Sequence, residues 1–137
     1  MAKFYTIQLD DVYLTDTGLE SGDPCKLEVT GADALLFPFT GSTIISVDGT
    51  PVNQVFAAET RGRVLEIKPL VIAAELWTDI VALINTALGN SGTINIIGTG
   101  DIGNFDVEAL PLMPRPFEAK EFKNGRIKNP IFRFITT

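Results

Sequence analysis

A single stretch with a clean helical period, Pro69–Gly89, constrains the fold of this 137-residue chain more than any other part of it. At 100° per residue its apolar side chains fill one continuous arc of about 200°, wider than the ~100° stripe that one contact surface needs. Pro69 stands where a helix can begin, and Gly89 stands where one commonly ends. We expect a helix over about 72–88. The surplus width of the arc, its margin, lies around Trp77, Val81 and Leu88. These residues need a second cover, which comes either from a loop of the same chain or from another subunit.

Most of the remaining chain has the alternation and the punctuation of short β-strands. Asp48-Gly49 and Asn124-Gly125 are strong hairpin turns, and the three prolines of Leu110–Pro116 restrict that segment to a linker or a sheet edge. A helical turn over Ala32–Phe37 would be stopped by Pro38. Short connections favour antiparallel pairing, so we expect a β-rich α+β fold: an antiparallel β-sandwich or split barrel with one flanking helix. The expected strands are Lys3–Leu9, Val12–Leu14, Lys26–Thr30, Thr43–Val47, Thr50–Phe56, Arg63–Lys68, Thr93–Ile97, Phe105–Leu110, Phe117–Phe122 and Arg126–Ile135.

Length and composition indicate one domain over residues 1–137. Whether residues 1–24 belong to its body or form an extended arm or inter-subunit strand region stays open, because Asp16–Pro24 reads as a loop. The chain has no run of 18 apolar residues and no signal-peptide pattern, so we expect no membrane span. Its one cysteine, Cys25, excludes an intramolecular disulfide. Lys26 beside it could lower the thiol pKa, although a small apolar residue at a strand edge accounts for Cys25 more simply.

Charge is divided unevenly along the chain. Residues 1–60 hold nine acids and two bases, net −7, and residues 61–137 hold eight acids and nine bases, net +1, which gives the total of −6. The closing segment 115–137 holds six bases and two acids, net +4. Either the two halves fold against one another, or the acidic part of one copy meets the basic part of another copy. The acidic total argues against a protein that wraps nucleic acid through phosphate contacts.

The segment 98–103, Gly-Thr-Gly-Asp-Ile-Gly, matches the G-x-G-x-x-G pattern of dinucleotide-binding loops. That fingerprint requires a helix that begins inside it and holds the pyrophosphate. Here a segment with a strand period follows, and prolines come after it. We therefore interpret the motif as a hairpin loop and expect no nucleotide cofactor.

Residue types that carry catalysis or hold metals are scarce. The chain has no His, which removes the usual general base, the commonest metal ligand and the His-dependent triads. Asp10–Asp11 and the pair Asp106 and Glu108 are candidate acid/base pairs by proximity alone, and a solvated face is the more common role of such carboxylates. The spacing of a calcium loop is absent. We expect no enzyme activity, no metal and no cofactor.

The order of elements resembles that of the tail-tube and tail-hub domain of long-tailed bacteriophages, a family of tail tube, distal tail and baseplate hub proteins. The segment VLEIKPLVIAAELWTDIVALINTALG and the basic closing hairpin FKNGRIKNPIFRFITT carry most of the similarity. The resemblance implies a β-sandwich or split barrel with a helix on its flank. It also implies a homohexameric ring around a channel that passes DNA, and no catalytic residues.

From this resemblance we expect a structural virion protein, made in the cytoplasm of the bacterial host, that forms rings in the tail tube or tail tip. Its partners would be other copies and neighbouring tail proteins, with DNA passing through the channel without specific binding. The alternative is a soluble ligand-binding β-domain, such as a carbohydrate-binding module, with exposed aromatics drawn from Phe4, Tyr5, Tyr13 or Trp77. The expected subunit interface consists of Trp77, Val81, Leu88, Arg115, Lys120, Lys123, Arg126, Lys128 and Arg133.

Overall fold

The computed structural model describes residues 3–14, 27–36, 39–58, 61–100 and 103–137, which contain thirteen strands, one long helix and one single-turn helix. Every strand pair among them is antiparallel, as the short connections predict. The fold is therefore β-rich α+β with a flanking helix. The strands are β1 (Lys3–Leu9), β2 (Val12–Tyr13), β3 (Leu27–Thr30), β4 (Phe39–Ile45), β5 (Pro51–Ala58), β6 (Val64–Lys68), β7 (Val71–Ala73), β8 (Ile94–Thr99), β9 (Asn104–Pro111), β10 (Phe117–Glu118), β11 (Glu121–Lys123), β12 (Arg126–Lys128) and β13 (Ile131–Thr136).

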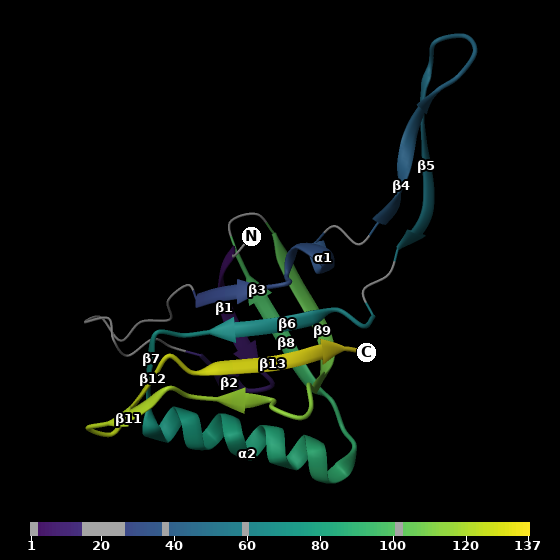
Figure 1. Cartoon of the computed structure of the whole chain (residues 1–137). Helices are drawn as coiled ribbons and strands as arrows, with labels where there is room; N and C mark the ends of the chain where they lie inside the picture. The colour runs from purple at the N-terminus through teal and green to yellow at the C-terminus, as the bar shows by residue number, and fades with distance from the viewer. Residues whose placement is uncertain (1–2, 15–26, 37–38, 59–60, 101–102) are drawn as a thin grey trace.

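Six strands close the main sheet on itself. They follow the order β13-β6-β3-β1-β8-β9, and β9 pairs again with the second half of β13, where Ile135 lies opposite Leu110. β10 pairs with the first half of β13 on the same edge, with Phe117 opposite Phe132. The proline-rich segment lies between these two strands, so it interrupts the ladder where the sheet closes. The two halves of the sheet face one another across a single core (Figure 1), as a sandwich or split barrel requires.

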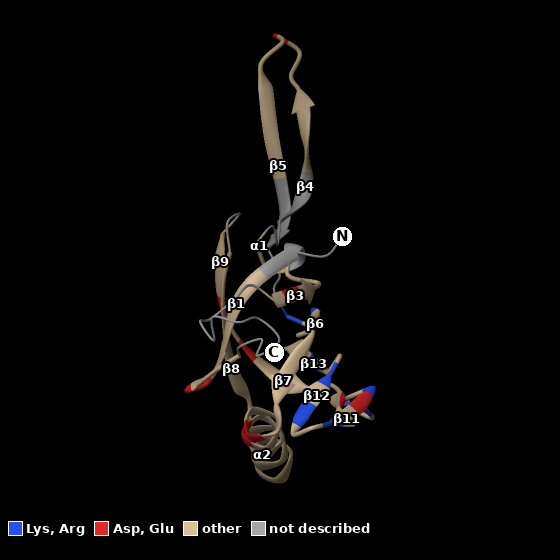
Figure 2. Ribbon diagram, turned by 90° about the vertical axis from the view of Figure 1, so that its left-hand side faces the viewer, with Lys and Arg blue, Asp and Glu red and all other residues tan. Residues whose placement is uncertain are grey.

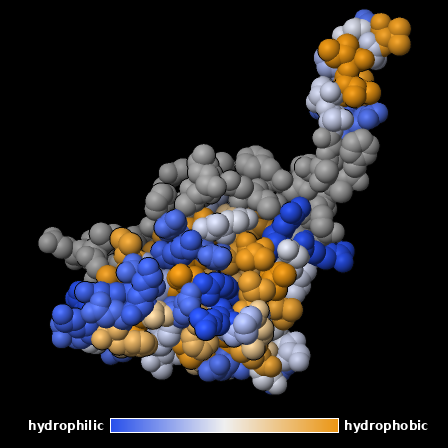
Figure 3. All heavy atoms as spheres, viewed as in Figure 1, coloured by the Kyte–Doolittle hydropathy of each residue, from blue (hydrophilic) through white to orange (hydrophobic). Residues whose placement is uncertain are grey.

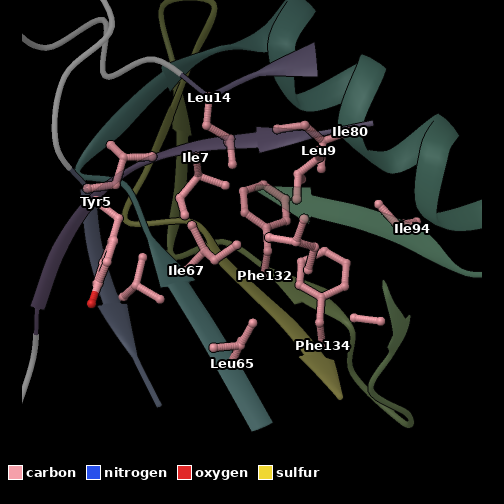
Figure 4. Close-up of a cluster of buried hydrophobic side chains, with 14 of the residues drawn as sticks. Tyr5, Ile7, Leu9, Leu14, Leu65, Ile67, Ile80, Ile94, Phe132 and Phe134 are labelled. Carbon is pink, nitrogen blue, oxygen red and sulfur yellow. The ribbon is translucent and has the colours of Figure 1, made fainter. Parts of the chain in front are cut away.

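Alternation along the strands explains why the core forms. In β1, Tyr5, Ile7 and Leu9 are at most 1% exposed, whereas the residues between them are only half-buried. Figure 4 shows these side chains meeting a second set from β6 and β13 across the interior. Each fully buried Leu or Ile contributes roughly 1.5–3 kcal/mol to folding. The second set consists of Leu65, Ile67, Phe132 and Phe134.

The two helices, α1 (Asp33–Leu36) and α2 (Ala74–Asn90), lie on opposite sides of the barrel (Figure 1). Ile80, Ile84 and Ala87 of α2 are buried in the core, in line with the predicted apolar arc. α1 shows that part of the ambiguous segment Ala32–Phe37 is a helical turn, and its Leu35 is buried. The barrel is thus covered on both sides by segments of its own chain.

The long helix begins at Ala74, two residues after the expected start at about residue 72. Val71–Ala73 forms a strand instead, and Ile72 pairs with Ile127 of β12. β-Branched residues favour a paired strand over a helical first turn, and here the partner comes from the far end of the chain. The helix ends one residue beyond Gly89, because Ser91 adopts the left-handed conformation (φ 51°) and the Gly92 amide donates to the Ala87 carbonyl at 2.8 Å.

The closing segment is divided more finely than its alternation predicts. The expected strand Arg126–Ile135 breaks at Asn129 (φ 50°) and Pro130, which lacks an amide donor. β12 before the break joins β11 and β7 in a separate three-stranded sheet, and β13 after it enters the barrel. The expected strand Phe117–Phe122 divides in the same way into β10 and β11.

The first strand is not an arm. Lys3–Leu9 lies between β3 and β8 in the barrel because its alternate side chains fill the core. Asp10, with φ 51°, turns the chain into β2. Of the alternatives left open for residues 1–24, Lys3–Tyr13 lies in the body of the domain, and the loop Asp16–Pro24 lies outside the described residues.

A projecting hairpin is formed further along the chain, and we call residues 39–58 the arm. Its strands β4 and β5 pair with each other and with no other described strand, and they extend away from the barrel (Figure 1). The predicted Asp48-Gly49 turn closes it, with Gly49 at φ 86°. The strands are longer than expected, since β4 begins at Phe39 and β5 runs to Ala58.

Candidate assembly surfaces

The arm exposes apolar side chains where the barrel cannot cover them. Ile45 is 73% exposed, Val47 is fully exposed, and Ile44 and Val52 are 42% and 44% exposed. Figure 3 shows these apolar residues around the end of the arm, well away from the body of the molecule. Exposed β-branched residues on a strand pair form a ready surface for association, and a lone two-stranded hairpin is only marginally stable in water. The arm therefore has the properties of a segment that binds another protein.

The arm carries almost no charge. Residues 39–58 contain no Lys or Arg and one acid, Asp48. The Asp48 carboxylate accepts hydrogen bonds from the Ser46 hydroxyl and from the Thr50 amide, at 3.0 Å for the latter, and these bonds lower its pKa. The Asp48 carboxylate thus stabilises the turn through these two hydrogen bonds. The surface that the arm presents is therefore made of apolar side chains and backbone groups rather than charges.

Trp77, expected at a subunit interface, is covered by its own chain. Its ring lies 5.6 Å from Phe117 and 5.9 Å from Phe122, both edge-on, and 5.6 Å from the tilted ring of Phe132. Edge-to-face packing at such distances adds about 0.5–1.5 kcal/mol per pair beyond burial. For Trp77 the closing segment of the same chain provides part of the second cover. The Trp77 ring is still only half-buried, so its predicted place in a subunit contact stays a prediction. Phe122 is still 66% exposed on its outer side.

The other two margin residues of the helix differ from Trp77. Val81 is half-buried, and Leu88 near the end of α2 is 38% exposed. Neither belongs to the aromatic cluster. Their predicted place in a subunit contact stays a prediction.

The outer side of the β11–β12 hairpin carries most of the bases of the closing segment. The register sets Lys123 opposite Arg126 and Lys128 opposite Glu121, and all four side chains are exposed. Among the described residues, the bases of this hairpin and Lys120 beside it form no ion pair. A hollow of about 410 Å³ is lined by Lys123, Asn124, Arg126 and Lys128. We call Lys120, Lys123, Arg126 and Lys128 the basic face.

The remaining two bases of the predicted interface are bound within the chain. The Arg133 guanidinium donates to Glu118 Oε1 at 2.5 Å and to the Arg115 carbonyl at 3.2 Å. Arg115 Nη1 lies 3.9 Å from Glu118 Oε2. The hydrogen bond from Arg133, and then the charges of Arg133 and Arg115, hold the pKa of the Glu118 carboxyl below its ordinary value. Arg115 and Arg133 therefore contribute less free charge to an intermolecular contact than the basic face.

On another side of the molecule a groove of about 540 Å³ runs between α2 and the β1–β2 turn. Asp10, Asp11 and Asp79 line it together with apolar residues that include Leu83 and Ile94, and no Lys or Arg is among the lining residues. Figure 2 shows carboxylates mainly on the side of α2, β8 and β9, and bases mainly on the side of β11 and β12. We call this feature the acidic groove.

Hydrogen bonds hold the polar surface beside the groove in place. Asn95 Nδ2 donates to Asp106 Oδ1 at 2.6 Å, and the Thr93 hydroxyl donates to Glu108 Oε2 at 2.8 Å. Asp10 Oδ1 accepts a hydrogen bond from the backbone N–H of Asn95 at 2.9 Å. Asp10, Asp106 and Glu108 therefore belong to a hydrogen-bonded, exposed polar surface, and Asp11 is exposed in the turn beside it. Within the described part of the chain, His, Cys, Asp and Glu form no cluster of three or more suited to a metal ion.

The glycine motif lies in the hairpin between β8 and β9, as predicted. Gly98 is buried opposite Phe105, and a Cβ at this position would overlap the Phe105 ring. The Gly100 amide donates to the Gly103 carbonyl at 3.2 Å and narrows the loop. Strand, loop and strand follow one another without a helix to hold a pyrophosphate. Gly98 is needed to make room for an aromatic ring, and that need accounts for the first glycine of the pattern.

Comparison with protein-family models, with curated proteins and with solved structures returns no significant match to this chain. Among the described residues, neither helix is both long enough and apolar enough to span a membrane. Cys25 lies outside the described residues.

Proposed function

We propose that this chain is a structural virion protein, a ring-forming subunit of a bacteriophage tail tube or tail tip. The observation that carries the proposal is the arm, a hairpin with apolar side chains, one acid and no base that projects from an otherwise self-contained barrel. The resemblance in element order supplies the class of assembly. It also supplies the homohexameric state, the neighbouring tail proteins as partners, the location in the virion and the passage of DNA through the ring without specific binding.

The arm is available to a protein partner because the barrel completes its core without arm side chains. The core consists of barrel and helix residues, and the described arm side chains from Ser42 to Gln54 lie outside it. An apolar surface without Lys or Arg has no means of neutralising phosphates, so it does not suit nucleic acid. When each copy gives an arm and receives one, the contact is heterologous, and repetition produces a ring or a stack of rings.

The described aromatics give little support to the alternative, a carbohydrate-binding β-domain. Such a domain presents aromatic rings on an exposed face, but Tyr5 is 1% exposed inside the barrel and Trp77 is packed among Phe rings. Tyr13 is 55% exposed and has no second described ring of the predicted set beside it. The side chain of Phe4 lies outside the described part.

The proposal is tested by making the arm polar. The double variant Ile45→Ser with Val47→Ser should stay folded as a monomer, with circular dichroism and melting temperature close to those of the wild type. It should lose the oligomer that native mass spectrometry and light scattering detect for the wild type. Gln54→Ser is the matched control, since it shortens an exposed arm side chain without removing apolar surface. A wild-type chain that is monomeric under all conditions, or an arm variant that assembles normally, contradicts the proposal.

A further inference from the structure

The charge distribution identifies a second contact between copies, in addition to the arm. We propose that the basic face of one copy docks against the acidic groove of a second copy. This inference rests on the proposed function, because it names two surfaces that meet in the same assembly. The described chain leaves positive charge unbalanced on the basic face and negative charge unbalanced in the acidic groove.

The basic face is only partly neutralised by its own chain, since Glu121 lies opposite Lys128 but no acid lies opposite Lys123 or Arg126. Four bases and one acid, Glu121, give this small hairpin a net charge of +3. Lys123 and Arg126 stand directly opposite each other across the two strands, an arrangement that destabilises a sheet unless an anion lies nearby. The apolar side of the hairpin is already occupied, because Ile127 is buried and Phe122 packs on Trp77. The hairpin is therefore held firmly from behind, and its charges are presented outward.

The acidic groove has the complementary character. Its lining includes three carboxylates and no base, over a floor that includes Val12, Leu83 and Ile94. Within the described part, Asp11 and Asp79 form no ion pair, and both are exposed. A hairpin closed by the two-residue turn Asn124-Gly125 has a narrow tip, which suits a groove better than a flat surface does.

The two surfaces cannot satisfy one another within one chain. The basic face lies beyond β12 on one side of the molecule, and the groove lies between α2 and the β1–β2 turn on another (Figure 2). A contact between different surfaces of identical copies is heterologous, so it continues from copy to copy into a ring or a filament. Complementary charge sets register and speeds encounter more than it adds affinity. We assign that role to this contact.

A second copy fits the basic face better than nucleic acid does. The chain as a whole carries −6, so duplex DNA approaching the face is repelled by the rest of the molecule. A second copy brings the groove, whose charge and concave form match the hairpin. Nucleic acid is nevertheless an outcome that the experiment has to distinguish.

The test uses two sets of charge reversals in the full chain. The first is Lys123→Glu with Arg126→Glu on the basic face. The second is Asp11→Lys with Asp79→Lys in the groove, with Asp10 left intact because it accepts from the Asn95 amide. Each variant alone should stay folded and assemble more slowly and less completely than the wild type, because the arm is intact in both. An equimolar mixture should regain assembly, because the native face of each variant matches the native face of the other.

Salt and a matched control sharpen the test. Sedimentation velocity should show that the wild-type association weakens as ionic strength rises from 0.05 to about 0.5 M, since the Debye length falls to a few Å. Lys68→Gln on β6 removes one positive charge away from both surfaces, where Lys68 Nζ lies 3.6 Å from Glu66 Oε2, and it should leave assembly unchanged. The neutral variants Lys123→Gln and Arg126→Gln should weaken association partly, and they replace any reversal that fails to fold.

The outcomes separate this inference from the proposed function. If the arm variant is monomeric while both reversed variants assemble like the wild type, the charge contact is wrong and the ring proposal stands. A labelled DNA duplex that binds the wild type but not the basic-face variant, with assembly unaltered, identifies nucleic acid as the partner and overturns the inference. A wild-type chain that stays monomeric at every ionic strength overturns both.

Discussion

Gly98 shows how one absent side chain shapes the barrel. It stands opposite Phe105 in a buried pair, and the aromatic ring occupies the space that a Cβ would need. The sequence drew attention to this glycine as part of a nucleotide-binding pattern. Its neighbours in space explain it instead as a packing requirement, and no local pattern predicts the ring that covers it.

We expect Gly98→Ala to lower the free energy of unfolding by about 1–3 kcal/mol, the usual cost of overpacking a core. Urea denaturation with a two-state fit measures it. Gly89→Ala is the control, because no atom outside the adjoining helix backbone lies within 4 Å of its added Cβ. Ala is also the better helix residue, so stability should hold or rise by up to about 1 kcal/mol. An equal loss in both variants would contradict the steric account. Calorimetry with NAD or ATP should detect no binding.

Trp77 joins α2 to the closing segment through three Phe rings. Trp77→Ala should therefore lower the free energy of unfolding by about 3 kcal/mol, at the low end of the range for such truncations because the ring is only half-buried. Trp77→Phe keeps an aromatic ring and should lose clearly less. Chemical denaturation of the two variants gives the comparison, and similar losses would show that the ring cluster contributes little.

The Glu118–Arg133 pair should make stability depend on pH in the acid range. The pKa of Glu118 is lowered in the folded chain below its ordinary value of 4.5, so the pair contributes its stabilisation above about pH 4.5 and loses it as pH falls through the lower folded value. Thermal melts of wild type and Glu118→Gln should therefore differ at pH 7, and the difference should shrink as the pH falls below about 4.5. A difference that stays constant with falling pH would point to packing of the side chain instead of its charge.

At the scale of elements, the sequence predicts well what depends on local periodicity. The alternation of Lys3–Leu9, the two hairpin turns and the apolar arc of the long helix all correspond to observed elements. The errors occur where a distant partner decides the outcome. Val71–Ala73 becomes a strand because β12 lies beside it, and the closing segment divides because its two halves join different sheets.

The arm illustrates the same limit for the candidate site. Its hairpin follows from the Asp48-Gly49 turn and the β-branched run before it, but the same run would serve equally well as a buried strand. Its exposure follows from the barrel being closed without it, which is a property of the whole topology. The basic face could be predicted, since the bases cluster in sequence, whereas the acidic groove combines Asp10 and Asp11 with Asp79 from a distant helix.

Shortening the arm should separate stability from assembly. Removing residues 43–53 and joining Ser42 to Gln54 through Asn-Gly keeps the register, since these two residues are partners in the hairpin. The melting temperature should change by only a few degrees, because the core keeps every member, and the oligomer should disappear. A large drop in melting temperature would show that the arm supports the barrel.

At the scale of the whole molecule, the last strand closes the structure. β13 pairs with β6 on one side and with β9 and β10 on the other, and Phe132 and Phe134 are fully buried. Deleting residues 131–137 removes fewer residues than shortening the arm does, yet it opens the barrel and empties its centre. We expect the truncated chain to show no cooperative unfolding transition by circular dichroism or calorimetry. A cooperative transition in that chain would mean that the barrel does not depend on its closure.

The arm enters and leaves the barrel between β3 and β6, which are neighbours in the sheet. Because it is an insertion between adjacent strands, its length is independent of barrel geometry. Two more residues in each of its strands would move the tip about 7 Å further out without altering any barrel contact. In an assembly held together through arms, the spacing from one copy to the next is then set by the length of one hairpin. Evolution, or an engineer, can adjust that repeat distance without redesigning the subunit.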